Sequence, residues 1–268
     1  MQRLPVPIMS MPNQQRIAAF LDHQVALIDH TLTLRRRQNE LLAERLEANL
    51  RRVLASDAAR VWVPLRRRNV RVTTGPFGTA FSASEYVDGG VPMINPLHIR
   101  DGGLVPEAHV SVAPEVAARL SRFALRQGDL IVSRKGDIGR SALVGPDSEG
   151  WICGSDSIAL RLAGSSMNPN FTWHLLRLPE VRGQLSAQSL AATMPSLNEG
   201  NLLTLRVPDL PQSEQADLAD HARDLVETHR AARGLLQRSD ALLEERKQAL
   251  IAAAVSGQFD MTTARSVT

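Results

Sequence analysis

The chain has 268 residues, of which 43% are hydrophobic and 22% charged, so it can form one or two globular domains and is not a disordered or fibrous protein. Its single cysteine, Cys153, cannot form an internal disulfide, which excludes a disulfide-stapled secreted scaffold and a cysteine-rich zinc module. Residues 1–12 are too short and too interrupted by proline for a signal peptide, and no later run approaches the roughly 18 apolar residues of a membrane span. These properties predict a soluble, cytoplasmic protein.

The formal net charge of +3 conceals an uneven distribution. All but two of the 31 basic residues are arginine, and residues 35–71 hold eleven arginines against four acidic residues. Such a run is either a solvated helix face or a site for a polyanion, because guanidinium groups match phosphates and guanine edges.

Two segments about 200 residues apart repeat one apolar pattern. From Leu21 and from Leu218, apolar residues recur in alternating steps of four and three, which is the period of a coiled coil. Pro12 and Pro211 precede the two segments, and Gly257 follows the second as a stop signal. A helix of about 40 residues extends roughly 60 Å, so each helix needs a partner, and the other copy is the nearest candidate.

The residues predicted to pair the two helices are Leu21, Val25, Ile28, Leu32, Leu42, Leu46, Leu225, Leu236, Leu243 and Leu250. Polar residues interrupt the seam at Arg35, Asn39, Asn49 and Arg246. Such interruptions can fix the register of a coiled coil at some cost in stability, which gives these four residues a structural explanation.

Between the two segments the pattern changes to short apolar runs broken by glycine and proline. It predicts strands at 61–64, 70–74, 91–95, 130–133, 142–145, 158–162 and 203–207. Two helices are predicted among them, one from Pro114 to Phe123 and one that begins at Pro169 after Asn168. The mixture predicts an α+β fold for the middle domain.

Motifs that would indicate an enzyme are absent or incomplete. There is no glycine-rich phosphate loop, dinucleotide fingerprint or metalloprotease helix motif. The N-P-L-H run at 95–98 shares only its first two residues with the N-P-P-[YF] motif of some amino-methyltransferases. Asp209, Glu245 and Lys247 match a nuclease signature formally, but residues two apart on a helix diverge by roughly 200°. The sequence therefore predicts a chain with no catalytic residues.

Metal and thiol chemistry also lack support in the sequence. The seven histidines do not cluster with carboxylates at ligand spacing, so surface or seam positions explain them better. Cys153 follows Trp151 and Ile152, and it is expected to be a buried apolar residue. No metal and no cofactor is predicted in this chain.

Three loops of the middle domain suit binding. The first, 66–78, joins a basic run to a Gly-Pro turn, which is also typical of an ordinary strand with one exposed basic face. The second, 128–140, is a strand entering a turn with three cations, where glycine is expected to serve backbone geometry. The third, 188–198, is uncharged and rich in small polar groups, which suits base edges and equally a surface loop.

Taken together and in order, these features resemble the specificity subunit of type I restriction-modification systems, and in particular about one half of such a subunit. The sequences that carry the resemblance are the helix lead-ins at 6–22 and 206–215, G-P-F-G at 75–78, E-Y-V-D-G-G-V-P-M-I-N at 85–95, G-D-L-I-V-S-R-K-G-D-I-G-R at 128–140 and the closing stretch at 242–260. A full family member has two target recognition domains, and this chain has one.

The resemblance implies the following division of the chain: a remnant resembling the end of a missing recognition domain (1–11), a first spacer helix (12–56), a target recognition domain (57–207), a second spacer helix (208–257) and a tail (258–268). It also implies that the two helices pair as an antiparallel coiled coil and dock methyltransferase subunits.

The function implied by the resemblance is non-catalytic recognition of double-stranded DNA. The chain would direct methyltransferase and restriction subunits to a bipartite site in a cytoplasmic defence complex. S-adenosylmethionine and ATP are then expected on the partner subunits. A chain with one recognition domain would pair with a second copy of itself, and two-fold symmetry then predicts a palindromic target.

Under this hypothesis, phosphate contacts are expected from Arg66, Arg67, Arg68, Arg71, Arg134, Lys135 and Arg140. Base-edge contacts are expected from Thr73, Thr74, Ser189, Thr193 and Asn198. The alternative is a coiled-coil assembly or inhibitor protein that docks methyltransferase subunits without recognising DNA. Salt-sensitive duplex binding would discriminate against that alternative.

Overall fold

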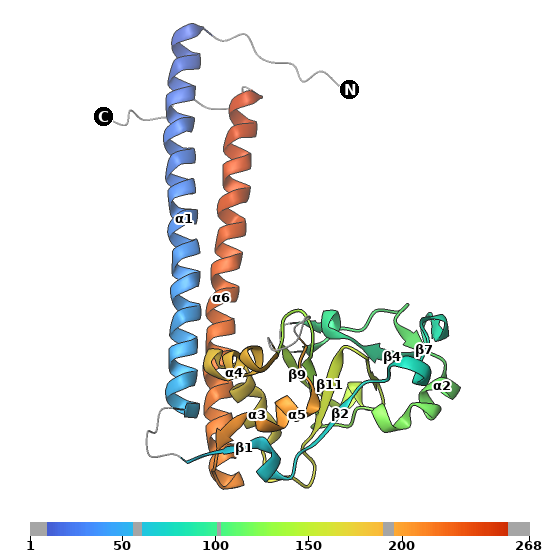
Figure 1. Cartoon of the computed structure of the whole chain (residues 1–268). Coiled ribbons are helices and arrows are strands. Elements are labelled where there is room, and N and C mark those ends of the chain that lie inside the picture. The colour runs from blue at the N-terminus through green and yellow to red at the C-terminus, as the bar shows by residue number, and fades with distance from the viewer. Residues whose placement is uncertain (1–9, 56–60, 101–102, 190–195, 257–268) are drawn as a thin grey trace. The chain divides into compact units, whose positions relative to one another are not determined.

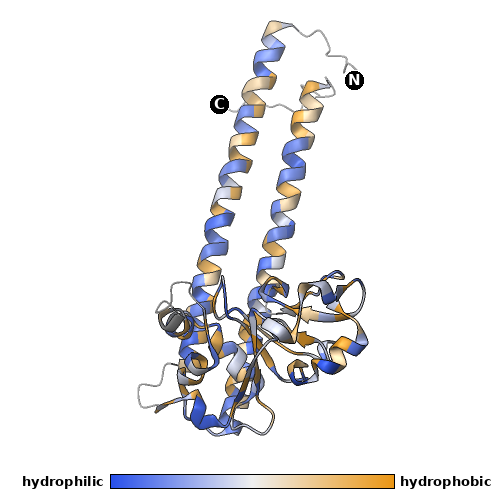
Figure 2. Ribbon diagram, turned by 45° about the vertical axis from the view of Figure 1, so that its right-hand side comes forward, coloured by the Kyte–Doolittle hydropathy of each residue, from blue (hydrophilic) through white to orange (hydrophobic). Residues whose placement is uncertain are grey.

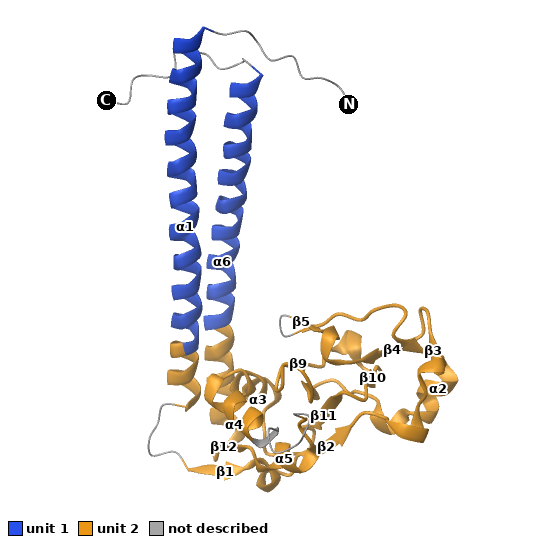
Figure 3. Cartoon of the chain, turned by 45° about the horizontal axis from the view of Figure 1, so that its top comes forward, with its two compact units in different colours: residues 1–47, 225–268 blue, residues 48–224 orange. Residues whose placement is uncertain are grey.

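The structure, a computed structural model, describes residues 10–55, 61–100, 103–189 and 196–256. The chain forms two compact units, which Figure 3 distinguishes by colour. Unit 1 comprises Met1–Glu47 and Leu225–Thr268, and unit 2 comprises Ala48–Asp224. Most of the predicted N-terminal remnant and the whole predicted tail lie outside the described residues.

Unit 1 is built from two long helices. α1 spans Met11–Ala55 and α6 spans Gln212–Val255, and most of each helix belongs to this unit. The two lie side by side (Figure 1) and run in opposite directions, because Asp29 meets Lys247 at 2.6 Å whereas Arg35, farther along α1, donates to Ser239, farther back along α6, at 3.5 Å. The antiparallel pair is therefore confirmed.

The seam of this pair follows the predicted spacing. Hydrophobic and hydrophilic residues alternate along both helices (Figure 2), and Ile28, Leu32 and Leu236 are buried. The other predicted pairing residues are half-buried, namely Leu21, Val25, Leu42, Leu46, Leu225, Leu243 and Leu250. Periodicity alone was enough to find these positions because the contact between two long helices repeats with the helix turn.

The polar positions of the seam follow the prediction less closely. Arg35 and Asn39 are half-buried, as expected, but Arg246 is exposed and the prediction for it is wrong. The seam position after Leu243 is four residues on, at Lys247, and not three residues on, at Arg246. The Lys247 ammonium is paired with Asp29. Asn49 is half-buried but belongs to unit 2.

Unit 2 is a domain of mixed helices and strands. Its shorter helices are α2 (Pro114–Arg119), α3 (Pro169–Leu176), α4 (Pro179–Ser189) and α5 (Glu199–Thr204). Its 3-10 helices are η1 (Leu65–Arg68), η2 (Gly78–Ala80), η3 (Ala83–Glu85), η4 (Pro96–His98), η5 (Ser121–Phe123) and η6 (Pro146–Ser148). Its strands are β1 (Trp62–Pro64), β2 (Arg71–Thr74), β3 (Tyr86–Val87), β4 (Val91–Ile94), β5 (Ile99–Arg100), β6 (Gly103–Leu104), β7 (Ser111–Val112), β8 (Leu130–Ser133), β9 (Ser141–Leu143), β10 (Ile152–Cys153), β11 (Ser157–Arg161) and β12 (Arg206–Pro208).

Two four-stranded sheets form the centre of unit 2. Their strand orders are β2-β11-β8-β9 and β10-β4-β7-β3, and the pairs β1-β12 and β5-β6 form separate two-stranded sheets. One hydrophobic cluster joins the two sheets, since it contains Ile94 of β4 together with Ile131 of β8 and Ala159 of β11. Cys153 lies in the same cluster, fully buried as predicted, and burial raises the pKa of its thiol to about 12.

Most of the predicted elements of unit 2 are present, with shifts of one or two residues at their ends. The predicted helix from Pro114 to Phe123 is shorter than expected, because α2 ends at Arg119 and the 3-10 helix η5 follows it. The prediction of a strand at 203–207 is wrong in its first half, because α5 continues to Thr204 before β12 begins at Arg206. Helix α4 was not predicted. Its apolar face is narrow, since Val181 and Leu185 are its buried hydrophobic residues and Gly183 lies in its middle.

Arg68 is a structural residue of unit 2. Its side chain is buried, and its guanidinium donates to the Asp209 carboxylate at 2.6 Å and to the carbonyl oxygens of Leu210 at 2.8 Å and Pro208 at 3.4 Å. It thereby joins η1 to the segment that follows β12. The prediction that Arg68 contacts phosphate is wrong, because this guanidinium is enclosed by the protein.

Replacing Arg68 by alanine should lower the free energy of unfolding by about 2 kcal/mol, because the change removes the donor of the Asp209 carboxylate and one hydrogen bond to each of two buried carbonyls, those of Pro208 and Leu210. The Leu210 carbonyl keeps the side-chain amide of Gln215 as a second donor. Asp209 is 49% exposed, so water replaces part of the lost ion pair. Arg67→Ala, at an exposed position on the same turn, should change stability by no more than about 0.5 kcal/mol. Urea unfolding of both variants measures the difference, and equal effects would contradict this role for Arg68.

Candidate nucleic-acid interface

The pairing of β11 brings two of the predicted binding loops together. β11 is antiparallel to both of its neighbours, so β2 and β8 run in the same direction on either side of it. Thr74 pairs with Ile158 and Ser133 pairs with Ser157, so both strands end beside the start of β11. The chain segments that follow β2 and β8 consequently leave the sheet at one end.

The end of the third predicted loop reaches the same place through hydrogen bonds. The Leu197 N–H donates to the carbonyl of Arg134 at 2.9 Å, and Nε of Arg134 donates back to the carbonyl of Leu197 at 3.2 Å. The Glu199 carboxylate accepts from the Thr74 N–H at 2.6 Å. Parts of all three predicted loops therefore meet, although they are far apart in the sequence.

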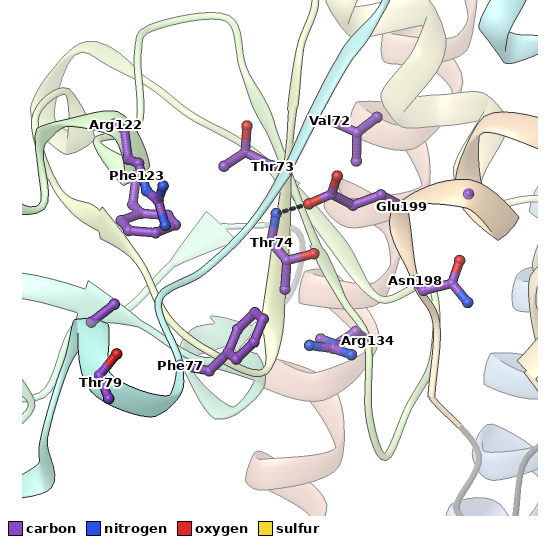
Figure 4. A pocket seen from close by; sticks show the side chains of 12 residues that line it. Val72, Thr73, Thr74, Phe77, Thr79, Arg122, Phe123, Arg134, Asn198 and Glu199 are labelled. Carbon is purple, nitrogen blue, oxygen red and sulfur yellow. Dashed lines mark hydrogen bonds between the residues drawn. The ribbon is translucent and has the colours of Figure 1, made fainter.

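A cavity of about 840 Å³ lies where they meet, and we call it the sheet-end cavity (Figure 4). Four of the residues predicted to contact DNA line it, namely Thr73, Thr74, Arg134 and Asn198. The other lining residues are Val72, Phe77, Thr79, Ala80, Arg122, Phe123, Glu199 and Gly200.

The charged groups of the sheet-end cavity are Arg122, Arg134 and Glu199. The Arg122 guanidinium lies 4.3 Å from the centre of the Phe123 ring, a contact that orients the cation without neutralising it. Arg134 is held by the carbonyls of Leu197 and Ser155, at 3.2 and 3.4 Å. Within the described part of the chain neither arginine forms an ion pair with Glu199, so the lining presents a net positive charge.

Several cavity residues were not singled out from the sequence. Phe77 belongs to the first predicted loop, but its 69% exposure could not be known from spacing, and a large exposed aromatic ring is informative. Arg122 lies outside the three loops that the sequence analysis predicted to bind DNA. Glu199 immediately follows the third loop. Asn198, predicted to contact a base, caps α5 with its side-chain oxygen, which accepts from the Asn201 N–H at 2.8 Å.

The remaining predicted cations lie outside the sheet-end cavity. Arg66, Arg67 and Arg71 are exposed, and no ion pair or side-chain hydrogen bond holds them among the described residues. They differ in this from Arg68, their neighbour in the sequence. All three can therefore meet an anion without first breaking an interaction of the protein.

Lys135 and Arg140 already have anionic partners on the surface. Lys135 pairs with Asp156 at 2.7 Å, and Arg140 pairs with Asp137 at 2.9 Å. Surface pairs of this kind are worth at most about 1 kcal/mol, so phosphate could replace either carboxylate. Of the other predicted base contacts, the side chain of Ser189 and the whole of Thr193 lie outside the described residues.

Gly75 determines how the chain passes from β2 to Phe77. A Cβ atom at this position would lie 1.9 Å from the carbonyl oxygen of Gly154, and the Gly75 N–H donates to the carbonyl of Ser157 at 3.1 Å. Only glycine allows the two backbones to approach so closely. The glycines of the second loop serve geometry as predicted, since Gly136 and Gly139 have φ values of 67° and 82°.

Other kinds of site were sought in the described residues. No group of three His, Cys, Asp or Glu side chains there is placed to hold a metal ion. Among the helices of the described ranges, none is both long enough and apolar enough to cross a membrane.

No protein-family model and no curated protein matches the sequence. A chain from a study of complex assembly and conformational transition of the type I R-M system matches with a TM-score of 0.75 and 18% identity, over 95% of this chain and 62% of that chain. The HsdS subunit from Thermoanaerobacter tengcongensis matches with a TM-score of 0.58 and 18% identity, over 95% of this chain and 60% of that chain. The chain has the fold of an HsdS subunit. The resemblance seen in the sequence is thus confirmed for the fold.

The chain spans less than two thirds of the length of either matched protein. Its HsdS-like elements include both long helices and one sheet-rich domain, and the sheet-end cavity belongs to that domain.

Within this HsdS fold, Gly75→Ala should disturb the sheet-end cavity. The added methyl group meets backbone atoms of Gly154, which cannot rotate away, so the segment from β2 to Phe77 must shift and stability should fall by about 2 kcal/mol or more. Gly183→Ala is the control, because its methyl group meets no atom within 4 Å and alanine favours helix α4. Thermal unfolding measures both effects, and a harmless Gly75→Ala change would show that this approach of backbones is not needed.

Proposed function

We propose that this chain recognises a sequence in double-stranded DNA through the sheet-end cavity and the arginines around it. The observation that carries the proposal is the meeting of three separate loops at one cavity that offers cations, hydroxyls and an exposed aromatic ring. The HsdS fold supports it independently, because that fold was indicated by the sequence and found again by comparison of structures.

The proposed division of roles follows exposure and position. Arg66, Arg67 and Arg71 contact phosphates, because their guanidinium groups are exposed and held by no interaction among the described residues. Arg122 and Arg134, which line the cavity, contact phosphates from there. Thr73 and Thr74 line the cavity from β2, and their hydroxyls can donate to or accept from base edges.

The chemistry of modification and cleavage belongs, in this proposal, to partner subunits. The titratable groups of the sheet-end cavity are two arginines and one glutamate, which offer no nucleophile paired with a base. Methyltransferase subunits would bring S-adenosylmethionine, and restriction subunits would bring ATP. The present chain would select the target sequence on the DNA.

Removing one cavity cation should weaken DNA binding without changing the preferred sequence. For Arg122→Gln we expect weaker binding to every duplex and a salt dependence whose logarithmic slope is smaller by about 0.9, because each lost phosphate contact releases one fewer counterion. Arg37→Gln is the control, because it removes the same charge from α1 in unit 1, outside the sheet-end cavity, and should leave the slope unchanged. Titrations at several salt concentrations measure the slope in the assembled complex. Equal slopes for wild type and Arg122→Gln would count against phosphate contact by Arg122.

The long helices carry a second apolar row that their mutual seam does not use. Leu27, Leu34 and Leu41 of α1 are seven residues apart and 49%, 57% and 49% exposed. Leu235 and Leu242 of α6 are also seven apart and are 62% and 65% exposed. Residues seven apart lie on one side of a helix, so each helix presents an apolar strip. We propose that these strips dock methyltransferase subunits.

Two copies of the chain complete the proposed complex. One recognition domain contacts one half of the target, so two copies related by a two-fold axis contact a palindromic, bipartite site. The bases of the spacer between the two halves are not selected. DNA selected from a random pool by the assembled complex tests this arrangement. A non-palindromic site, or a single copy in the active complex, would contradict it.

The variant pair Leu34→Gln and Leu242→Gln tests the docking strips. Each change removes an exposed leucine that contributes about 1.5–3 kcal/mol when a partner buries it, so methyltransferase binding should weaken by roughly tenfold or more while the stability of the chain alone stays the same. Leu97→Gln in unit 2, at a leucine that is 72% exposed, is the control. Pull-down with the methyltransferase subunit measures the effect.

An unchanged pull-down would show that the partner docks elsewhere. A stable complex that does not select any duplex would instead favour the assembly or inhibitor function, for which the same exposed leucines are sufficient.

A further inference from the structure

Glu199 places a carboxylate in a cavity that is otherwise suited to DNA. It is the first residue of α5, its side chain is exposed, and it lines the cavity together with Arg122 and Arg134. A carboxylate repels phosphate, so its presence lowers general affinity for DNA. Because the carboxylate weakens DNA binding in general, Glu199 is expected to serve either base recognition or the structure of the domain.

The position of the carboxylate is fixed by the sheet. One oxygen, Oε1, accepts from the backbone N–H of Thr74 at 2.6 Å, and Figure 4 shows the side chain reaching from α5 to this nitrogen at the end of β2. A hydrogen bond from an N–H to a charged oxygen is stronger than one between neutral groups. Glu199 is therefore held in one orientation without the help of a cation, since the described residues contain no ion pair to it. A positioned carboxylate keeps further lone pairs as acceptors.

The chemistry of base edges indicates which partner suits such a group. In the major groove, guanine offers two acceptors and thymine offers an acceptor and a methyl group, so both fail to donate. Adenine offers a donor beside the acceptor N7, which repels a carboxylate. Cytosine offers its N4 amino group as a donor with no neighbouring acceptor of its own, and carboxylates are known to accept from it.

We propose that Glu199 is a specificity-determining residue that accepts a hydrogen bond from the N4 amino group of one cytosine in the recognised duplex. This inference rests on the proposed function, since it assigns one base to the same cavity. The hydrogen bond to Thr74 serves to position the carboxylate. The competing explanation is that Glu199 only satisfies the Thr74 N–H and ties α5 to β2.

Glu199→Gln separates the two explanations. Glutamine has the same shape and keeps an amide oxygen for the Thr74 N–H, so a purely structural role predicts an unchanged DNA preference. It also introduces an NH₂ donor, and this combination suits adenine, with its N6 donor and N7 acceptor. We expect selection from random duplexes by the assembled complex to lose one cytosine and to accept adenine there, with a change in preference of roughly tenfold. Glu149→Gln removes an exposed carboxylate outside the cavity and should keep the wild-type preference.

A modified base provides a second measurement on the wild-type protein. N4-methylcytosine keeps one amino hydrogen for the base pair and presents a methyl group to the major groove. This substitution at the assigned position should weaken wild-type binding by roughly tenfold and have little effect on Glu199→Gln. At other cytosines of the site it should affect wild type and variant equally.

The outcomes distinguish this inference from the proposed function. If the wild-type complex selects a sequence and Glu199→Gln selects the same one with the same affinity, Glu199 only ties α5 to β2 and the inference is wrong, while DNA recognition stands. Loss of all selection in a folded Glu199→Gln complex would also overturn assignment of a single base. A wild-type complex that selects no sequence would overturn both.

Discussion

The pairing of β11 with two strands that run in the same direction is the constraint on which the candidate interface depends. Because β2 and β8 flank β11 and both end beside its first residues, the segments that follow them must leave the sheet together. Leu197, near the end of the third loop, is then hydrogen-bonded to Arg134 after β8, and Glu199, which follows the loop, is hydrogen-bonded to Thr74 at the end of β2. If β2 and β8 ran in opposite directions, the segments that follow them would leave the sheet at opposite ends.

Burial determines what each polar residue can do in this fold. Gln215 is fully buried at the start of α6, where its NH₂ group donates to the carbonyls of Ser166 and Leu210, at 2.9 and 2.8 Å, and its oxygen accepts from the Asn168 N–H at 2.8 Å. Every hydrogen bond that satisfies a buried amide also fixes the chain around it. Gln15 lies 200 residues before Gln215, at the matching place in the first of the two repeated segments, and it is exposed on α1. The two copies of the repeat are thus alike in periodicity and different in surroundings.

The two units suit two different tasks. Unit 2 holds the cavity, the exposed arginines and the carboxylate of Glu199, which under the proposed function select the DNA. Unit 1 holds the antiparallel seam and the exposed leucines outside it, which under the proposed function bind the methyltransferase subunits. In this proposal the recognition loops can change without disturbing assembly, because the two functions use different residues in different units.

The sequence by itself determined the elements whose signal is local. The four-three spacing located the seam from Leu21 to Leu250, and the short apolar runs located most strands, because helix and strand periods repeat within a few residues. It also predicted three candidate binding loops, which include four of the residues that line the cavity. Only the tertiary structure decided that these loops meet, that Arg68 is enclosed while Arg67 is exposed, and that Lys247 replaces Arg246 at the seam. Burial, strand order and the partners of each side chain depend on residues far apart in the chain, and local spacing carries no information about them.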